Sequence, residues 1–331
     1  MLNNKVILIT GGTGSFGKKF TETILRDYHP EKLIIFSRDE FKQYEMAKVF
    51  PESKYPAIRY FLGDIRDKDR LYRAFEGVDY VIHAAALKQV SALEYNPMEA
   101  VKTNIVAADN IVDAAVDRRV KKVIVLSTDK AVSPVNLYGA TKLAAEKIFI
   151  AANAYGGTRV KFSIVRYGNV IGSRGSVIPL FLKLKSENKL DFPITDEQMT
   201  RFWITLEQGV ALVIKALEES EGGEIFVPII PSMKLTDLAR VIEPKCSFKI
   251  IGIRPGEKIH EILFSEDEAR KTKKFQGMYV VLPQFIVSTA TENKYASFPS
   301  VPEGFVYKSD TNDQVLSVAE LKKIIDKIPV D

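Results

Sequence analysis

The chain has 331 residues, of which 46% are hydrophobic, so it is long enough for one large domain or two closely packed ones. Its 47 basic and 42 acidic residues leave a net charge of +5 and are interspersed, which argues against a nucleic-acid-binding stripe. One cysteine, Cys246, excludes an internal disulfide and favours a cytoplasmic location. No apolar run reaches the roughly 20 residues of a transmembrane helix, and nothing at the N-terminus is typical of a signal peptide.

The N-terminus combines a short apolar strand, a glycine-rich turn and a helix. Residues 5–10 predict the strand, and Gly11, Gly14 and Gly17 follow it before a helix that continues to about residue 28. Glycines at this spacing allow a tight turn and a close approach of the backbone to a pyrophosphate at the helix N-terminus. We therefore expect a dinucleotide to contact Gly11, Thr13, Gly14, Ser15, Phe16 and Gly17.

A second strand, over residues 33–36, leads into the residues that select the cofactor. Ser37, Arg38 and Asp39 follow it directly. An arginine here accommodates the 2′-phosphate of NADP, whereas an acidic residue binds the ribose of NAD. Ser37, Arg38 and Lys42 favour NADP, and Asp39 leaves NAD open.

Strands and helices alternate from residue 5 to about residue 167, which predicts an α/β fold with a doubly wound, mostly parallel sheet. Helical patterns cover residues 15–28, 39–49, 68–75, 97–118 and 137–154. Glycines and prolines break this rhythm after Gly168, so we expect a dinucleotide-binding domain over 1–168 and a smaller α/β lobe over 169–331, with some later elements returning to the main sheet. In the second part we expect short strands at 225–227 and 249–251, a long surface loop over 285–307 and a terminal helix over 318–328.

Reactive side chains gather after the buried strand at residues 123–126. Ser127, Thr128, Asp129 and Lys130 follow at its carboxyl end, the edge where ligands bind in open α/β sheets. The next helix carries Tyr138 and Lys142, which lie four residues apart on one face. The phenol has an ordinary pKa of about 10, and a neighbouring cation lowers it toward the working range of a base. By itself this pair is also compatible with an ordinary amphipathic helix.

These features resemble the extended short-chain dehydrogenase/reductases, which have a Rossmann-like fold. The resemblance includes Asp64 and Ile65 after the third strand, Ala84 and Ala85 after the fourth, and Asn104 in the next helix. It is closer to the inverting UDP-N-acetylglucosamine 4,6-dehydratases that open pseudaminic acid synthesis. The motifs that carry this closer resemblance are HAAALK at 83–88, STDK at 127–130, RYGN at 166–169, SRGSV at 173–177, MTRF at 199–202 and RPGEK at 254–258.

The resemblance implies a redox-neutral dehydration of UDP-N-acetylglucosamine. Tyr138, supported by Lys142, takes the proton of the sugar 4-hydroxyl while NADP takes the C4 hydride. Lys130 then removes the C5 proton, and Asp129, next to Thr128, donates a proton to the leaving 6-hydroxyl. The hydride returns to C6, and C5 is reprotonated from the opposite face. These roles require a neutral Lys130, with a pKa below about 10.4, and a protonated Asp129.

The resemblance also implies binding roles for residues outside the catalytic group. Asp64, Ile65, Ala84, Ala85 and Lys88 are expected beside the cofactor. The UDP-sugar is expected to contact Lys88, Asn169, Arg174, Val177, Thr195, Arg201, Arg254 and Glu257. A homo-oligomer, formed through the helices at 97–118 and 137–154, is implied as well.

Three histidines and one cysteine offer no metal-ligand spacing, so we expect no metal site. We expect His83 to be a satisfied buried histidine, His29 to lie in a turn and His260 to lie on a helix. A retaining 4,6-dehydratase, a UDP-sugar 4-epimerase and a non-catalytic dinucleotide-sensing scaffold remain as alternatives. Tyr138 and Lys142 argue against the scaffold, and Asp129 with Lys130 argues against the epimerase.

Overall fold

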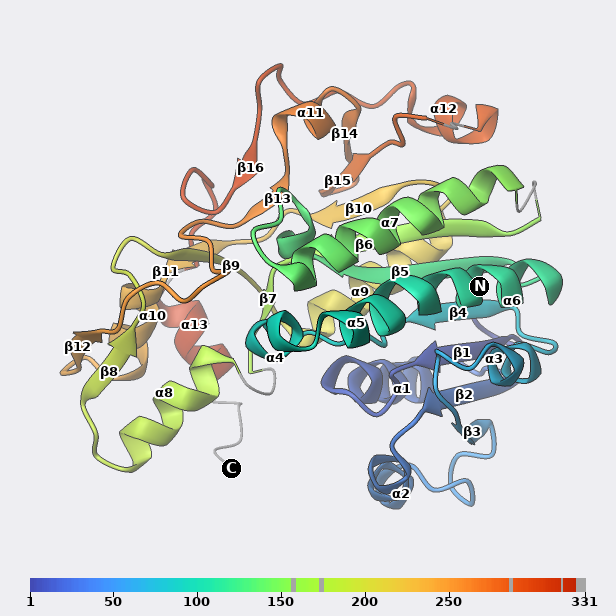
Figure 1. The fold of residues 1–331 in the computed structure, drawn as a ribbon, viewed down its shortest axis with the longest axis horizontal. Helices are drawn as coiled ribbons and strands as arrows, with labels where there is room; N and C mark the ends of the chain where they lie inside the picture. Colours follow the sequence, from blue (N-terminus) through green and yellow to red (C-terminus); the bar gives the residue numbers. More distant parts are fainter. Residues whose placement is uncertain (156–158, 173–175, 286–287, 317, 326–331) are drawn as a thin grey trace.

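A nine-stranded sheet forms the centre of the molecule (Figure 1). The computed structural model describes residues 1–155, 159–172, 176–285, 288–316 and 318–325. The sheet runs in the order β14-β15-β10-β6-β5-β4-β1-β2-β3, and the strands from β3 to β10 are parallel. Their bounds are β1 Val6–Thr10, β2 Lys32–Ser37, β3 Ile58–Leu62, β4 Tyr80–His83, β5 Lys122–Thr128, β6 Lys161–Tyr167 and β10 Ile225–Pro228. The antiparallel edge consists of β14 Thr272–Phe275 and β15 Met278–Val281.

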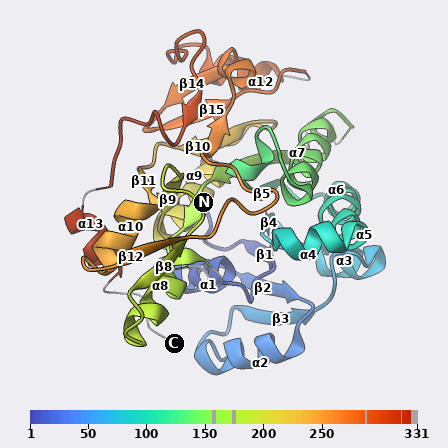
Figure 2. The ribbon, with the colours of Figure 1, turned by 60° about the vertical axis from the view of Figure 1, so that its left-hand side comes forward.

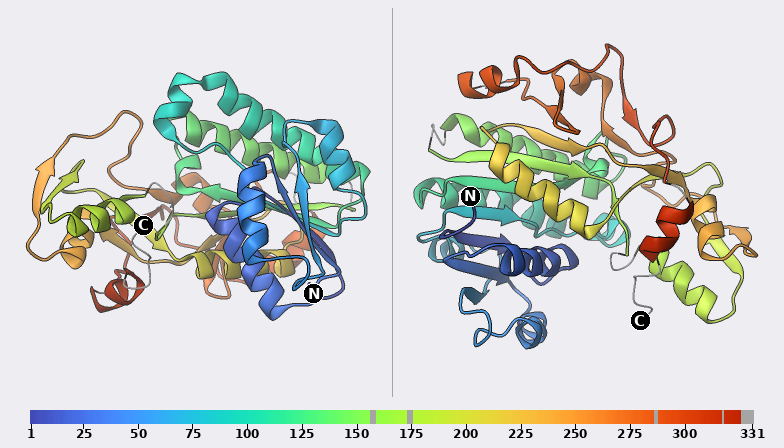
Figure 3. Two further views of the ribbon diagram at one scale, coloured as in Figure 1. Left: turned by 90° about the horizontal axis from the view of Figure 1, so that it is seen from below. Right: turned by 180° about the vertical axis from the view of Figure 1, so that it is seen from behind.

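Helices cover both faces of this sheet. The face seen in Figure 1 carries α3 Lys68–Ala74, α6 Ala107–Asp117 and α7 Leu137–Tyr155. The opposite face carries α1 Ser15–Asp27 and α9 Leu206–Glu219, which lie against each other in the right-hand view of Figure 3. The β3 edge is flanked by α2 Glu40–Val49 (Figure 2). The expected doubly wound architecture is confirmed, because strands such as β1 are buried along their whole length and need apolar cover on both sides.

The helix expected over 97–118 is present but irregular. It begins as α5 Pro97–Ala100, continues as a π-helical turn over Val101–Val106 and ends as α6. Asn104, inside the π turn, accepts from Leu87 N at 2.9 Å and donates to Leu87 O at 3.0 Å. The turn therefore holds the chain that follows β4 in place, and π turns occur mostly at such functional positions. A short helix that the sequence did not predict, α4 Val90–Tyr95, precedes it.

The second part of the chain builds a separate apolar core at the left of Figure 1. The two-stranded sheet of β8 Asp191–Ile194 and β12 Ser247–Ile250 packs there with α8 Val177–Ser186, α10 Leu235–Ile242 and α13 Val318–Ile325. A three-stranded sheet of β7 Asn169–Val170, β9 Thr200–Ile204 and β11 Ser232–Lys234 adjoins it. Later elements return to the main body, namely α9, β10, β14 and β15. The predicted boundary near residue 168 therefore stays a proposal, and it concerns only where this lobe begins.

Several local expectations for the second part are wrong. The segment expected as a loop over 285–307 contains α12 Thr289–Tyr295, which Ser288 caps by accepting from Thr291 N at 3.1 Å. Tyr295 anchors this helix by packing against Phe275 and Phe298, an apolar contact that no sequence periodicity indicated. The strand expected at 249–251 occupies Ser247–Ile250, and His260 lies in an irregular segment before β13 Ile262–Phe264, not on a helix.

The remaining elements complete the upper edge in Figure 1. β13 pairs with β16 Tyr307–Lys308, and α11 Glu266–Ala269 follows β13. The terminal helix begins at residue 318 as expected, and its predicted end lies outside the described residues. Among the described helices, none combines the length and the apolar character needed to cross a membrane.

Candidate active site

A cavity of about 730 Å³ lies where the parallel strands end. It brings together residues from the turns after β1, β2, β3, β4 and β5 and from α7. All the residues predicted to contact the cofactor line it: Gly11, Thr13, Gly14, Ser15, Phe16, Gly17, Ser37, Arg38, Lys42, Asp64, Ile65, Ala84, Ala85, Lys88, Tyr138 and Lys142. Their common location follows from the parallel part of the sheet, because the strands from β3 to β10 present their carboxyl ends at one edge.

The first turn of the chain is shaped for a close ligand. Gly11 has φ +67°, and a Cβ there would lie 2.8 Å from Ala85 N, so only glycine fits between the turns after β1 and β4. Gly14 precedes α1 and has no side chain with which to cap it. The first N–H groups of this 13-residue helix therefore remain available to an anion in the cavity.

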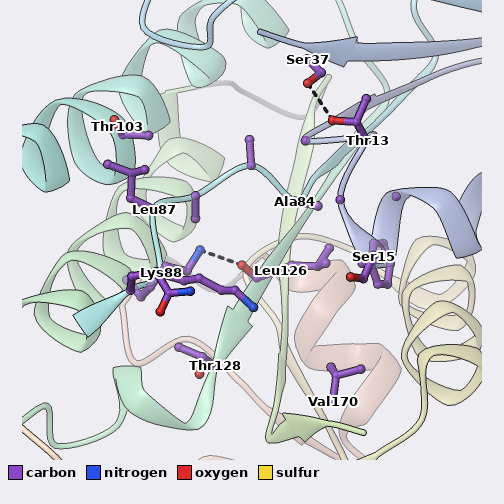
Figure 4. Close-up of a pocket in the computed structure, with 18 of the residues that line it drawn as sticks. Thr13, Ser15, Ser37, Ala84, Leu87, Lys88, Thr103, Leu126, Thr128 and Val170 are labelled. Atoms are coloured by element: carbon purple, nitrogen blue, oxygen red, sulfur yellow. Dashed lines mark hydrogen bonds between the residues drawn. The ribbon is translucent and has the colours of Figure 1, made fainter. Parts of the chain in front are cut away.

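Beside this turn lie the residues that were predicted to select the cofactor. Thr13 and Ser37 share a hydrogen bond of 2.9 Å across β1 and β2 (Figure 4). Arg38 Nη1 lies 3.6 Å from Asp64 Oδ2, and half of the Arg38 side chain remains exposed at the cavity. Asp39 also lines the cavity, but it caps α2 by accepting from Lys42 N at 2.9 Å and pairs with Lys42 Nζ at 2.7 Å.

At the other end of the cavity, β5 delivers the acid/base residues. Thr128 ends the strand, and Asp129 and Lys130 form the 3-10 turn Asp129–Ala131. Thr128 and Lys130 line the cavity, whereas Asp129 is fully buried behind them. Asp129 Oδ1 accepts from Thr128 Oγ1 at 3.0 Å and from Lys130 Nζ at 2.9 Å. A carboxyl group and an amine are thus held side by side at the wall that faces the ligand.

The start of α7 lies against this turn. A Cβ on Gly139 would lie 2.1 Å from Lys130 O, so a side chain at this position would push the helix away from the turn. Glycine therefore allows Tyr138 to line the same cavity as Lys130. The Gly139 contact was not among the residues predicted from sequence.

The charges around Lys130 differ from the expectation. Burial lowers the pKa of Lys130, but the carboxylates of Asp129 and Glu261 more than offset burial and hold the pKa above its usual value. The expected lowering is therefore wrong for this arrangement. Burial, assisted by the charge of Glu261, raises the pKa of Asp129, which is the direction an acid requires.

The phenol and amine on α7 also differ from the expectation. Burial raises the pKa of Tyr138 to about 12, and the cation that opposes burial is Lys130 and not Lys142. Lys142 Nζ donates to Leu126 O at 2.7 Å, and burial lowers the pKa of Lys142 to about 8. The expected effect of Lys142 on the Tyr138 pKa is therefore not found, although both side chains line the cavity.

No metal site accompanies these groups within the described part of the chain. His83 is buried at the end of β4, where its Nδ1 shares a 2.8 Å hydrogen bond with Thr10 Oγ1. Burial lowers the pKa of His83 to about 3, so the ring is neutral. The prediction of a satisfied core histidine is confirmed.

Comparison with known proteins assigns the chain to a family. A family described as polysaccharide biosynthesis protein matches residues 7–283. The chain belongs to this family. It is a family of extended short-chain dehydrogenase/reductases, as the sequence motifs indicated.

Individual members of the family extend the likeness over nearly the whole chain. A Campylobacter jejuni protein named UDP-N-acetylglucosamine 4,6-dehydratase (inverting) is 54% identical, covering 98% of each chain. A Rickettsia bellii protein named UDP-glucose 4-epimerase is 43% identical over 84% of this chain and 83% of its own. The X-ray structure of Pen from Bacillus thuringiensis has a TM-score of 0.88 and 38% identity, covering 98% of each chain.

The residues that the family resemblance assigned to the sugar nucleotide lie in different places, and only some of them line the cavity. Lys88 and Asn169 line the cavity, and the buried Asn169 Oδ1 has no hydrogen-bond partner among the described residues. Thr195 and Arg201 are buried and do not line it. Val177 is the first residue of α8, next to the cavity residue Ser176. Arg174 lies outside the described residues.

Arg254 and Glu257 lie on the loop between β12 and β13 and do not line the cavity. They pair at 3.7 Å, and the Arg254 side chain is 62% exposed. Asn136 Nδ2 donates to Gly256 O at 2.7 Å, and Gly256 lies against Val90, which lines the cavity. The loop is thereby docked beside the site, where Arg254 is exposed next to Glu257.

Arg201 is placed differently from its expected role. Its Nη1 donates to Thr200 O and Ile259 O, and its Nη2 donates to Lys258 O. Its Nε lies 3.6 Å from Glu261 Oε1. The guanidinium therefore binds backbone carbonyls and Glu261 of the protein itself, and it does not line the cavity.

Sequence reasoning missed Glu261. This carboxylate is 2% exposed, and its Oε1 lies 3.2 Å from Lys130 Nζ. It precedes β13 in a segment without regular periodicity, 131 positions after Lys130 in the chain. Nothing local in the sequence distinguishes it from a surface glutamate.

Proposed function

We propose that the chain is a UDP-N-acetylglucosamine 4,6-dehydratase that inverts C5. The observation that carries this proposal is the Asp129–Lys130 pair, 2.9 Å apart, beside Tyr138. Oxidation at C4 needs one base, whereas elimination of water across C5 and C6 needs a second base and an acid. The 54% identity to the Campylobacter jejuni enzyme supports the same substrate. Entry of the product into pseudaminic acid synthesis is part of the proposal.

The residues of the cavity fit a nicotinamide dinucleotide. The close approach at Gly11 and the uncapped start of α1 suit a pyrophosphate. When bound, the nicotinamide would supply a reversible hydride acceptor. Tyr138 would take the proton of the 4-hydroxyl, and Lys142 would orient the cofactor end of the site.

The Asp129–Lys130 pair would carry the elimination. Lys130 would accept the C5 proton, and Asp129 would give its proton to the leaving 6-hydroxyl, releasing water. These two transfers turn a neutral pair into an ion pair whose attraction develops as the reaction proceeds. The raised pKa of Asp129 favours the protonated acid at the start, and the raised pKa of Lys130 makes it a stronger base once neutral.

Incubation of UDP-N-acetylglucosamine with the protein, followed by NMR, tests the function. We expect a 6-deoxy-4-keto sugar with inverted C5, formed without net consumption of cofactor. Formation of UDP-N-acetylgalactosamine as the product would instead identify the 4-epimerase that the Rickettsia bellii relative suggests. Retained C5 configuration would identify a retaining dehydratase. If no conversion occurs, with or without added NADP, the protein is the non-catalytic dinucleotide-sensing scaffold.

We propose NADP as the preferred cofactor. Arg38 is half exposed at the cavity and pairs only at 3.6 Å with Asp64, whereas Asp39, the residue that left NAD open, also lines the cavity but already caps α2 and pairs with Lys42. We expect Arg38→Ala to weaken NADP by about 10-fold or more, as for loss of one charge-assisted contact, and to change NAD little. Titration with both cofactors measures this. Equal weakening of NADP and NAD would contradict the assignment.

We propose a homo-oligomer that packs through α5, α6 and α7. The protein itself uses part of the surface of these helices, since Ala107, Ala108, Ala145 and Ala152 are buried against the core. The same side of the molecule nevertheless exposes large apolar side chains, namely Tyr95, Met98 and Val106. Light scattering at micromolar concentration should give at least twice the mass of one chain. A monomer mass would refute this.

A further inference from the structure

Glu261 lies in a buried row of alternating charges behind the catalytic turn. Its Oε1 is 3.2 Å from Lys130 Nζ and 3.6 Å from Arg201 Nε. Asp129 continues the row on the other side of Lys130. Two carboxylates and two cations thus alternate from β9 through the segment before β13 to the turn after β5.

The backbone of Glu261 is fixed from both sides. Its N–H donates to Ser309 Oγ at 2.9 Å, and Ser309 N donates to Glu261 O at 2.9 Å. The Ser309 hydroxyl also lies 2.6 Å from Thr200 Oγ1 on β9. The backbone of Glu261 is therefore fixed, and its carboxylate lies between Lys130 and Arg201.

Two carboxylates direct the amine of Lys130. An ammonium has three N–H groups; here Lys130 Nζ donates to Asp129 Oδ1 at 2.9 Å and lies 3.2 Å from Glu261 Oε1. The third position on the Lys130 nitrogen is then left to face the cavity, which Lys130 lines. With Asp129 alone, the amine would rotate about its last bond and present its lone pair in several directions.

We propose that Glu261, clamped by Arg201, is a positioning residue that orients the Lys130 amine toward the C5 proton and keeps the acid proton on Asp129. This inference rests on the proposed dehydratase function. Glu261 does not line the cavity, so it acts through Lys130 and Asp129 and not on the sugar. One further observation fits this role: Glu261 Oε2 and Asp129 Oδ2 are both buried without a hydrogen-bond partner among the described residues. Leaving both oxygens fully charged is costly, which favours a proton on one carboxyl group.

The charge of Glu261 acts on both catalytic groups in the same direction. It raises the pKa of Asp129 and that of Lys130. Glu261 is itself faced by Lys130, Arg201 and Lys258, which outweigh burial and hold its pKa below the usual value. Across the cavity, Lys88 and Tyr138 also interact with the charge of Lys130. These two stay in place when Glu261 is changed.

Glu261→Gln in the full chain tests the proposal through the pH dependence of kcat. Removing the negative charge lowers both pKa values, so both limbs of the profile should move to lower pH. Glu261→Ala, which also releases the amine, should lower kcat about 100-fold with little change in KM. Glu224→Gln is the matched control, because it changes another fully buried carboxylate, which accepts from Ser163 Oγ at 2.8 Å and does not line the cavity, and it should leave the pH profile in place.

A second measurement does not depend on the substrate. The rate at which a small amine-modifying reagent labels Lys130, followed by peptide mass against pH, should show a lower apparent pKa in Glu261→Gln than in the unchanged protein. Unchanged labelling and an unchanged pH profile in a folded variant would overturn the role of Glu261. If the unchanged protein fails to convert UDP-N-acetylglucosamine, the function fails, and the labelling result alone then decides whether Glu261 controls Lys130.

Discussion

Lys130→Ala should convert UDP-N-acetylglucosamine about 10²–10⁴-fold more slowly and should stop exchange of the C5 hydrogen with deuterated water. Lys130 supplies the amine that lines the cavity in contact with the buried acid Asp129, at 2.9 Å. Without it, the sugar still reaches Tyr138 and is oxidised at C4, but its C5 proton has no acceptor. Binding of the UDP-sugar and of NADP should change little. Single-turnover NMR in deuterated water reports the oxidation and the exchange separately.

Loss of stability is the competing explanation for such a result. Lys130→Ala leaves Asp129 and Glu261 buried without their shared cation, so a lower melting temperature is expected as well. Lys130→Met keeps the apolar stem and serves as the second variant, while Lys102→Ala, at an exposed ion pair with Glu99, controls for loss of a surface lysine. If folded Lys130→Met still exchanges C5 at the rate of the unchanged protein, Lys130 is not the base. A product that keeps the D-configuration at C5 would contradict the inversion.

Arg166→Met should lower the free energy of unfolding by about 3–5 kcal/mol. Arg166 is fully buried on β6, and it pairs with Glu146 of α7 at 2.6 Å and with Glu268 of α11 at 3.0 Å. It also donates to Leu263 O at 2.9 Å. The substitution leaves Glu146 buried without its cation, and an unpaired buried charge is far more costly than a lost surface pair. Urea unfolding, followed by circular dichroism, measures the loss.

A second variant tests whether the unpaired charge causes the loss of stability. Arg166→Met combined with Glu146→Leu and Glu268→Leu removes all three charges, and it should recover most of the lost stability because no buried charge remains unpaired. A loss below about 1 kcal/mol for Arg166→Met alone, the size typical of exposed ion pairs, would show that the network is not buried in solution. Since Glu146 lies one turn beyond Lys142 on α7, the same network also fixes the helix that carries Tyr138.

The parallel α/β architecture and the position of the glycine-rich turn were predictable because their signals are local. The apolar run of β1 and the glycines after it lie within a dozen residues, and the run of β5 leads directly into Asp129 and Lys130. Parallel strands must place their carboxyl ends together, so residues from separate turns could be assigned to one cavity before any contact was known.

The irregular elements were less predictable because distant contacts stabilise them. The π turn over Val101–Val106 encloses Asn104, which binds the chain after β4 and also donates to Thr141 of α7 at 3.0 Å. The α12 helix is stabilised because its Tyr295 packs against Phe275 and Phe298. Neither set of partners is visible in the local periodicity of the segment concerned.

The sequence by itself determined the parallel fold, the glycine-rich turn after β1 and the placement of Asp129 and Lys130 at the end of β5, since each depends on a pattern along a single strand, turn or helix. Only the tertiary structure decided the electrostatics of those residues. It places Glu261 beside Lys130 and pairs Arg201 with Glu261. It also raises the pKa of Lys130, where a lowering was expected. A pKa depends on every charge within a few ångströms and on burial, and the chain brings those charges together from β5, β9 and the segment before β13.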